Sequence, residues 1–410
     1  MRKRVSPFLA LRYPNFRYFW IGLLISSIGT QMQVVGVTWH IYSLTHSAFS
    51  LGLIGLFRFL PLLLFSQIGG MLADSLDRKK LIFLNQILMS GFSLILALMT
   101  FTNSVNPFFI YFTIALLSLT QAIDAPARHA LTPHLLPREY FMNAVSLNTL
   151  MWQTSIVIGP SIAGFIIAYL GVGSVYLINS LSFFAVVTSL LFIHVPHLLP
   201  GKKPDFNFSG MIDGIRFIIK TPIISSTMLL DFIATFFSVS TTLLPIFAKD
   251  ILMVGPKGLG LLYASSSFGA VLAGLLFSSF HHVRNQGKVL LLSVFFYGIS
   301  TVLFGFSRSF YLSLLFLALS GAGDVVSTII RNTIRQMNTP DHLRGRTTAI
   351  NMVFYTGGPQ LGEIEAGIVA GFWGAPFAVI TGGAATILAT IIISISIPHI
   401  RKYHGDEITL

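Results

Sequence analysis

The positions of the charged residues limit what this chain can fold into more than any other feature of its sequence. Only 10% of its 410 residues are Asp, Glu, Lys or Arg, whereas a soluble domain is about 25% charged. Most of them fall in short segments between apolar runs, and each run is long enough, at roughly 20 residues, to cross a bilayer. Residues 69–80, which begin with two glycines and end with three basic residues, are typical of a loop between two such spans. We therefore predict an all-α membrane protein.

Twelve apolar runs can be distinguished, and their charged flanks predict an orientation. If both termini lie in the cytoplasm, 22 of the 26 Lys and Arg residues fall in cytoplasmic segments, as the positive-inside rule requires. These include Arg331 and Arg335, which follow the tenth run. The net charge of +12 is then accounted for by membrane insertion, not by nucleic acid. The predicted spans are residues 16–43, 50–73, 81–102, 107–127, 143–170, 173–195, 222–248, 258–280, 288–307, 309–330, 347–372 and 375–398.

The longest connection divides the predicted spans into two groups of six. We expect an N-terminal six-helix bundle over residues 1–195, a cytoplasmic linker over 196–221 that contains a short amphipathic helix, and a C-terminal bundle over 222–410. The halves resemble each other. Tyr111 and Asp124 align with Tyr311 and Asp324 at an offset of 200 residues, and Gly159-Pro160 aligns with Gly358-Pro359 at 199. We therefore predict two pseudo-symmetric bundles.

The segment after the second run carries a recognisable motif. Gly70, Asp74 and Arg78 resemble the loop motif of the major facilitator superfamily, although Ser75 and Asp77 depart from it. Residues 122–128, 133–139 and 58–61 are similar to the branch that contains the bacterial enterobactin exporter and related siderophore and drug exporters. The resemblance implies a secondary transporter with two six-helix halves that works by alternating access. It also implies a cytoplasmic charge lock made of Gly70, Asp74, Arg78, Asp124 and Arg128.

Ionisable residues within the predicted spans are candidates for proton coupling and gating, because each costs about 2.5–3.5 kcal/mol at the centre of a membrane. Arg58 and Glu363 are predicted at similar depths, roughly 12–15 Å from the outer end of their spans. The resemblance to the major facilitator superfamily implies that the second and eleventh spans face each other across the two halves. We therefore expect Arg58 to pair with Glu363 or with Glu365 when the outer side is closed, and favour Glu363 for the cavity. The alternative is a permanent structural ion pair.

The seventh predicted span carries one polar stripe. Asp231, Thr235, Ser238 and Thr242 are spaced i, i+4, i+7 and i+11, which places them on one helical face. Asp231 is the first candidate for proton binding, since burial away from a cation favours a neutral carboxyl group. The stripe could instead pack helix against helix through hydroxyl bonds.

A substrate cavity is expected where polar side chains interrupt the first and seventh spans. Gln31, Trp39 and His40 could contact a polar, partly flat molecule together with Thr235 and Ser238, or they could bond neighbouring helices. In the fifth span, Gly159, Pro160 and Gly164 resemble a motif of proton-coupled exporters, and small residues next to a proline favour close helix packing. Gly357 to Pro359 repeat this pattern in the eleventh span.

No catalytic, cofactor or metal motif is found. The chain has no cysteine, and neither His129 with His134 nor His281 with His282 has the spacing of a metal site. We expect no enzyme activity, but a proton-coupled exporter of an organic small molecule, such as a siderophore or drug, in a bacterial inner membrane. Its expected partners are this substrate, protons, the lipid bilayer and a periplasmic or outer-membrane export partner, but no nucleic acid. Uptake of a siderophore or other solute, or a non-transporting receptor or assembly factor, are the alternatives.

Overall fold

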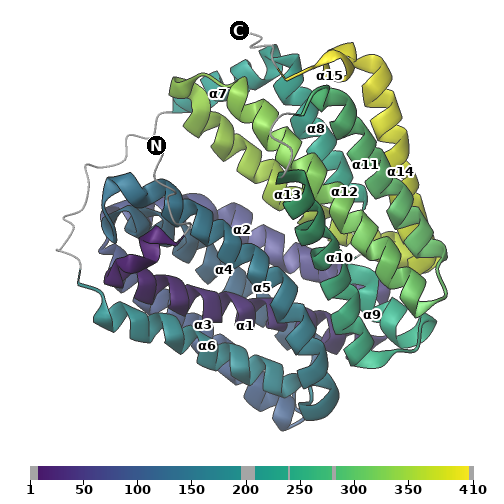
Figure 1. Ribbon diagram of the computed structural model, residues 1–410. Helices are drawn as coiled ribbons and strands as arrows, with labels where there is room; N and C mark the ends of the chain where they lie inside the picture. Colours follow the sequence, from purple (N-terminus) through teal and green to yellow (C-terminus); the bar gives the residue numbers. More distant parts are fainter. Residues whose placement is uncertain (1–7, 195–207, 239–240, 279–282, 406–410) are drawn as a thin grey trace. The chain divides into compact units, whose positions relative to one another are not determined.

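The computed structural model describes residues 8–194, 208–238, 241–278 and 283–405, and this part of the chain is helical with short connections (Figure 1). Eleven of its helices are long and apolar enough to cross a membrane. The predicted span 347–372 lies in α13 (Asp341–Trp373), a helix of 33 residues that is not among these eleven. The all-helical class is therefore observed, whereas the count of twelve spans stays a prediction.

The chain divides into two compact units. The first contains residues 1–46 and 57–205, and the second contains residues 47–56 and 206–410. The helices of the first unit are η1 (Leu9–Arg12), α1 (Pro14–Thr45), α2 (Ala48–Ser75, from residue 57), α3 (Arg78–Phe101), α4 (Pro107–Leu131), η2 (Thr132–His134), η3 (Arg138–Tyr140), α5 (Phe141–Leu170) and α6 (Val172–Phe192). The second unit contains the start of α2, up to residue 56. Its other helices are α7 (Phe208–Lys220), α8 (Pro222–Phe237), η4 (Thr241–Leu243), α9 (Leu244–Ile246), η5 (Phe247–Ile251), α10 (Gly255–Ser278), α11 (Gln286–Phe306), α12 (Phe310–Met337), α13, α14 (Ala375–Ser396) and α15 (Pro398–Lys402).

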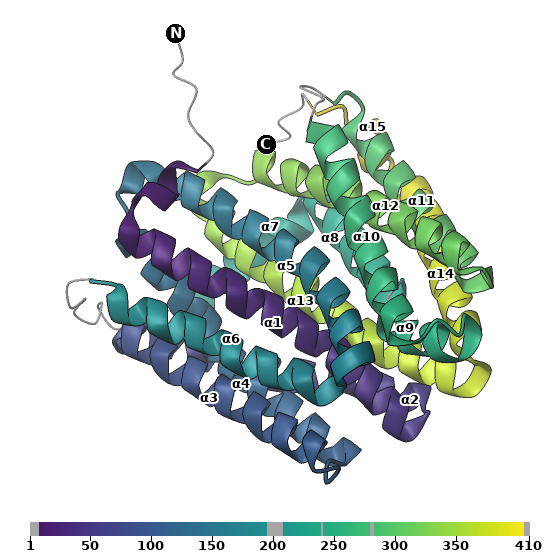
Figure 2. The ribbon, with the colours of Figure 1, turned by 60° about the horizontal axis from the view of Figure 1, so that its bottom comes forward.

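The two units repeat one packing scheme. In the first, α1 packs on α5 and α6, and α3 packs on α4 and α6. In the second, α8 packs on α13 and α14, and α11 packs on α12 and α14, so each contact has its counterpart. Figures 1 and 2 show α1 lying beside α6 and α11 beside α14. The repeat in the sequence thus corresponds to a repeat in the structure.

Local chemistry fixes where these helices begin and turn. Proline occupies the first turn of α1, α4, α8, α14 and α15, where its missing N–H costs no hydrogen bond. The Asn106 side chain accepts a hydrogen bond from the Phe109 N–H at 2.8 Å and so caps α4. Gly171 and Gly374 have φ angles of 79° and 89°, so each turns the chain where a residue with a side chain would be strained.

The predicted loop at residues 69–80 is much shorter than expected. Gly69 and Gly70 lie inside α2, which continues to Ser75, and α3 begins at Arg78. The Asp77 side chain caps α3 by accepting hydrogen bonds from the N–H groups of Lys79 and Lys80, at 2.9 and 3.2 Å. The expectation that the glycines open a loop was therefore wrong. Gly69 is instead a packing residue, because a Cβ atom there would overlap the carbonyl oxygen of Ala122 on α4.

The predicted span 222–248 is not one continuous helix. Its first helix, α8, ends at Phe237, and η4, α9 and the π-helical turn η5 follow the undescribed residues 239–240. Thr242 therefore lies in η4, outside the helix that carries Asp231. Residues 196–207 of the predicted linker and the pair His281-His282 lie outside the described residues, while α7 lies within the predicted linker.

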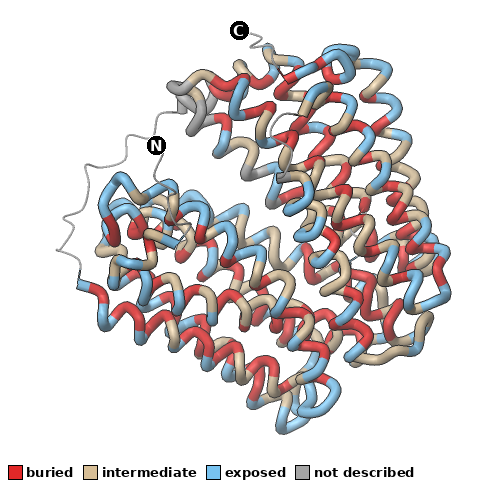
Figure 3. Tube along the Cα trace, in the orientation of Figure 1, coloured by how far each residue is buried: buried red, intermediate tan, exposed pale blue. Residues whose placement is uncertain are grey.

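Burial along the helices is typical of a membrane bundle. Each unit has a core of buried apolar side chains, formed around Phe16, Phe19 and Ile82 in the first and around Ile224, Leu290 and Ile334 in the second. Figure 3 shows long helices alternating between buried and exposed residues. Many exposed residues are large and apolar, such as Leu275 and Leu292 at 65% and 67% exposure, which suits a surface that faces lipid.

Candidate functional site

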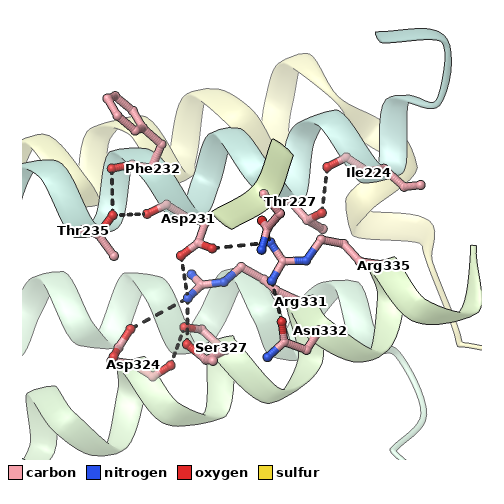
Figure 4. Close-up of polar contacts among 12 residues, drawn as sticks. Ile224, Thr227, Asp231, Phe232, Thr235, Asp324, Ser327, Arg331, Asn332 and Arg335 are labelled. Atoms are coloured by element: carbon pink, nitrogen blue, oxygen red, sulfur yellow. Dashed lines mark hydrogen bonds and ion pairs between the residues drawn. The ribbon is translucent and has the colours of Figure 1, made fainter. Parts of the chain in front are cut away.

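Three charged side chains meet in the core of the second unit (Figure 4). Asp231 of α8 lies between two arginines of α12: its Oδ1 atom is 3.0 Å from Arg331 Nη2, and its Oδ2 atom is 3.4 Å from Arg335 Nη1. The side chains of Asp231, Arg331 and Arg335 are only 3%, 2% and 10% exposed. Asp324 extends the cluster, with its Oδ1 atom 3.8 Å from Arg331 Nη2 and its side chain 46% exposed. Two acids thus balance two arginines, and we call these four residues the Asp231 cluster.

Neutral side chains orient the two guanidinium groups. Arg331 donates to the Thr328 hydroxyl at 2.8 Å. Arg335 donates to the side-chain oxygen of Asn332 at 2.5 Å and to that of Asn351 on α13. Because each arginine is tied to its own helix or to α13, Asp231 is the link that joins α8 to this network.

A small polar cavity adjoins Arg335. Its volume is about 100 Å³, which leaves room for a few water molecules. All the residues that line it are polar: Asn332, Arg335, Gln336, Thr339, Thr347, Thr348 and Asn351. One guanidinium of the Asp231 cluster can therefore meet water or a small polar group.

Two sequence expectations about this region were wrong. Arg331 and Arg335 were expected in a cytoplasmic segment, but α12 runs on to Met337 and buries both. Asp231 was expected away from cations, but it contacts two. The apolar run ends before Arg331, so hydropathy alone stopped the span too early. The signal that could have found the arginines is their i, i+4 spacing, with Asp324 seven residues before Arg331 on the same helical face.

Part of the charge lock expected in the first unit is present. The fully buried Asp124 forms an ion pair with Arg128, as expected from their i, i+4 spacing, and accepts a hydrogen bond from Gln86 at 3.1 Å. Arg78 instead donates to the carbonyl oxygens of Ala73 and Ala130, at 3.3 and 3.2 Å, and contacts His134 at 2.9 Å.

Asp74 is exposed, and within the described parts of the chain it forms no ion pair. The structure thus brings Asp124 and Arg128 together but leaves Asp74 and Arg78 outside that pair. Gly70, the remaining lock residue, has open space where a Cβ atom would lie.

Two of the residues expected to line a substrate cavity, His40 and Ser238, contact neighbouring helices. His40 is buried and lies 3.1 Å from the hydroxyl of Tyr176 on α6. Ser238 is buried and shares a 2.8 Å hydrogen bond with Thr386 of α14. Thr235 donates to the backbone oxygen of Asp231 at 2.8 Å. The contacts of His40 and Ser238 fit the helix-packing alternative, whereas the Thr235 bond lies within α8. Gln31 and Trp39 are half-buried on α1.

The two Gly-Pro motifs mark equivalent close contacts. A Cβ atom on Gly159 of α5 would lie 2.6 Å from the Cβ atom of Gln31 on α1. A Cβ atom on Gly358 of α13 would lie 2.6 Å from the Thr235 hydroxyl on α8. The expected tight packing is therefore observed at both glycines, and Pro160 and Gly164 are buried in the same helix as Gly159.

Three further residues expected in gating are half-buried. Arg58 lies in the part of α2 that belongs to the first unit, and Glu363 and Glu365 lie in α13 of the second. Their pairing stays a prediction. No group of three His, Cys, Asp or Glu side chains that could hold a metal ion occurs among the residues described.

Comparison with known proteins identifies the family. Residues 5–407 match the family described as transmembrane secretion effectors. The enterobactin exporter EntS of Shigella boydii is 27% identical over 388 residues, covering 93% of this chain and 91% of that protein. EntS of Escherichia coli strain ED1a is equally similar, with the same identity and coverage.

Solved transporter structures share the fold at low sequence identity. The nucleoside transporter NupG has a TM-score of 0.71 at 13% identity, with 95% of this chain and 99% of that chain covered. A transporter of the POT family, in complex with a thioalcohol-conjugated peptide, has a TM-score of 0.72 at 12% identity, with 96% of each chain covered. The chain is therefore a multi-pass membrane transporter, not an enzyme, and belongs to the transmembrane secretion effector family of the major facilitator superfamily.

Proposed function

We propose that this transporter exports a small organic molecule, such as a siderophore, across a bacterial inner membrane in exchange for protons. Two of its relatives are enterobactin exporters, which supports both the direction and the substrate class. Even without the buried Arg331 and Arg335, 20 of its 26 basic residues lie in one set of predicted loops, which supports cytoplasmic termini. A substrate released on the periplasmic side would then pass to a periplasmic or outer-membrane export partner.

The observation that carries the proton-coupling part of this proposal is the Asp231 cluster. Charges buried at membrane depth are costly, and they persist where they are paired and serve transport. Both ion pairs need the carboxylate form of Asp231, because a neutral carboxyl group can still accept a hydrogen bond but offers no charge to either guanidinium. Proton binding by Asp231 would weaken the link from α8 to α12 and so shift the balance between conformations.

Transport assays in proteoliposomes test this role, with enterobactin as the first substrate. Asp231→Asn should lower proton-driven transport at least tenfold while leaving substrate counterflow measurable, because the amide is nearly isosteric but carries no titratable proton. Glu363→Gln serves as the second candidate in the same assay. Glu139→Gln is the control, since Glu139 is an exposed acid in η3. Full proton-driven transport by the Asp231→Asn variant would contradict its role.

We also propose that Arg58 pairs with an acid of α13 as an outer gate. Arg58→Glu should then abolish transport, because it places two like charges together. Adding Glu363→Arg should restore part of the rate, whereas adding Glu365→Arg should not. Transport rates of the three variants, measured at equal amounts of protein in the membrane, test this pairing. Failure of both second substitutions to rescue would exclude the pair.

A further inference from the structure

A groove lies on the surface of the second unit between α11, α14 and α15. Its volume is about 360 Å³, and most of its lining is apolar. The lining residues are Lys288, Leu291, Leu292, Phe295, Thr390, Ile391, Ser394, Ile395 and Arg401. We call this feature the α11–α14 groove.

The groove is cationic at one end and mostly apolar along the rest. Lys288 lies in the first turn of α11, and Arg401 lies in α15, directly after α14. Both side chains are exposed, and neither forms an ion pair within the described ranges of the chain. From Lys288, the lining of α11 continues through Leu292 to Phe295, a rise of roughly 10 Å.

The segment that carries Arg401 is held firmly against α11. Tyr403 is buried, its carbonyl oxygen accepts the Gly287 N–H at 3.1 Å, and its hydroxyl accepts a hydrogen bond from Asn338 at 2.9 Å. His404 lies 2.6 Å from the side-chain oxygen of Asn285. Arg401 is therefore fixed near the start of α11, at the same end of the groove as Lys288.

A groove in the first unit shows what the cations add. The surface between α1 and α6 has a cavity of about 280 Å³, lined by Tyr18, Ile21, Gly22, Ile25, Ala185, Thr188, Ser189 and Phe192. It has a comparable apolar lining but neither Lys nor Arg. Such a surface suits an acyl chain without selecting the charge of its headgroup, whereas the α11–α14 groove offers two cations at one end.

We propose that the α11–α14 groove is a binding site for an anionic phospholipid. Lys288 and Arg401 hold its phosphate, and an acyl chain lies against Leu292, Phe295, Ile391 and Ile395. The two basic residues lie on predicted cytoplasmic flanks, where anionic headgroups attract Lys and Arg. This site is separate from the Asp231 cluster and does not depend on what the protein transports.

Binding of defined lipids to the purified full-length protein tests this site. Native mass spectrometry of the protein titrated with phosphatidylglycerol or with phosphatidylcholine gives the affinity for each lipid. Lys288→Gln and Arg401→Gln should each lower the phosphatidylglycerol affinity about fivefold, and the double variant about 25-fold, by the usual contribution of one basic residue near a membrane surface. Phosphatidylcholine affinity should fall much less in these variants, because its choline cation offsets the charge of its phosphate.

The matched control is Lys402→Gln. Lys402 is exposed on the same short helix as Arg401 but does not line the groove. If Lys402→Gln lowers phosphatidylglycerol affinity as much as Arg401→Gln, the lipid is attracted by basic residues in general, which would overturn the proposal. Equal affinity of the unsubstituted protein for both lipids would also overturn it. Ser394→Leu narrows the groove without changing its charge, so it should weaken phosphatidylglycerol binding if the acyl chain lies there. Unchanged binding would contradict the placement of the acyl chain in the groove.

Discussion

Replacing Asp231 with alanine should lower the free energy of unfolding by about 3–5 kcal/mol. The reason is that Arg331 and Arg335 would keep their buried positive charges while losing the carboxylate that contacts both. Asp324 cannot compensate, because it lies 3.8 Å from Arg331 and is nearly half exposed. Chemical unfolding of the purified protein in mixed micelles, followed by circular dichroism, measures the change.

Asp324→Ala is the matched control for this experiment. It removes an acid of the same cluster from a partly solvated position, so we expect a loss under about 1 kcal/mol. Removing all three buried charges together, as in Asp231→Leu with Arg331→Met and Arg335→Met, should recover much of the stability, because apolar side chains can replace a buried ion network. If both variants lose the same free energy of unfolding, the contacts of Asp231 with the two buried arginines do not stabilise the protein as proposed.

Gly69→Ala should destabilise the protein by about 1–3 kcal/mol, while Gly70→Ala should leave it unchanged or stabilise it by up to about 1 kcal/mol. A Cβ atom on Gly69 would overlap the Ala122 carbonyl oxygen and lie 2.8 Å from the Ile123 Cα atom. These are backbone atoms, so α4 would have to move. Gly70 has no atom within 4 Å of the same position.

The pair can be compared in one thermal unfolding experiment, because both glycines lie in α2 and both substitutions raise helix propensity equally. Only the contact with α4 differs. A Gly70→Ala variant that is as unstable as Gly69→Ala would mean that α2 is sensitive to any side chain at this point. It would then contradict the assignment of Gly69 as the residue that sets the approach of α2 to α4.

The Asp231 cluster shows where sequence analysis was informative and where it was not. Asp231 was singled out because a carboxylate in an apolar run is rare, and that property can be seen in one segment alone. Its partners were missed because Arg335 is 104 residues away and follows the end of an apolar run. His40 and Ser238 were left open between ligand and packing roles for the same reason, since Tyr176 and Thr386 lie far from them in the sequence.

The sequence was enough to predict most of the membrane spans, the repeat of two halves and the Asp124–Arg128 pair. Membrane insertion depends on hydropathy summed over about 20 consecutive residues, and a helix pair depends on a spacing of four. Both are properties of neighbours along the chain. The tertiary structure alone decided that α8 ends at Phe237, that Gly69 contacts α4, and that Asp231 lies between two arginines. These depend on which helices pack together, because burial brings distant charges within 4 Å only when whole helix faces meet.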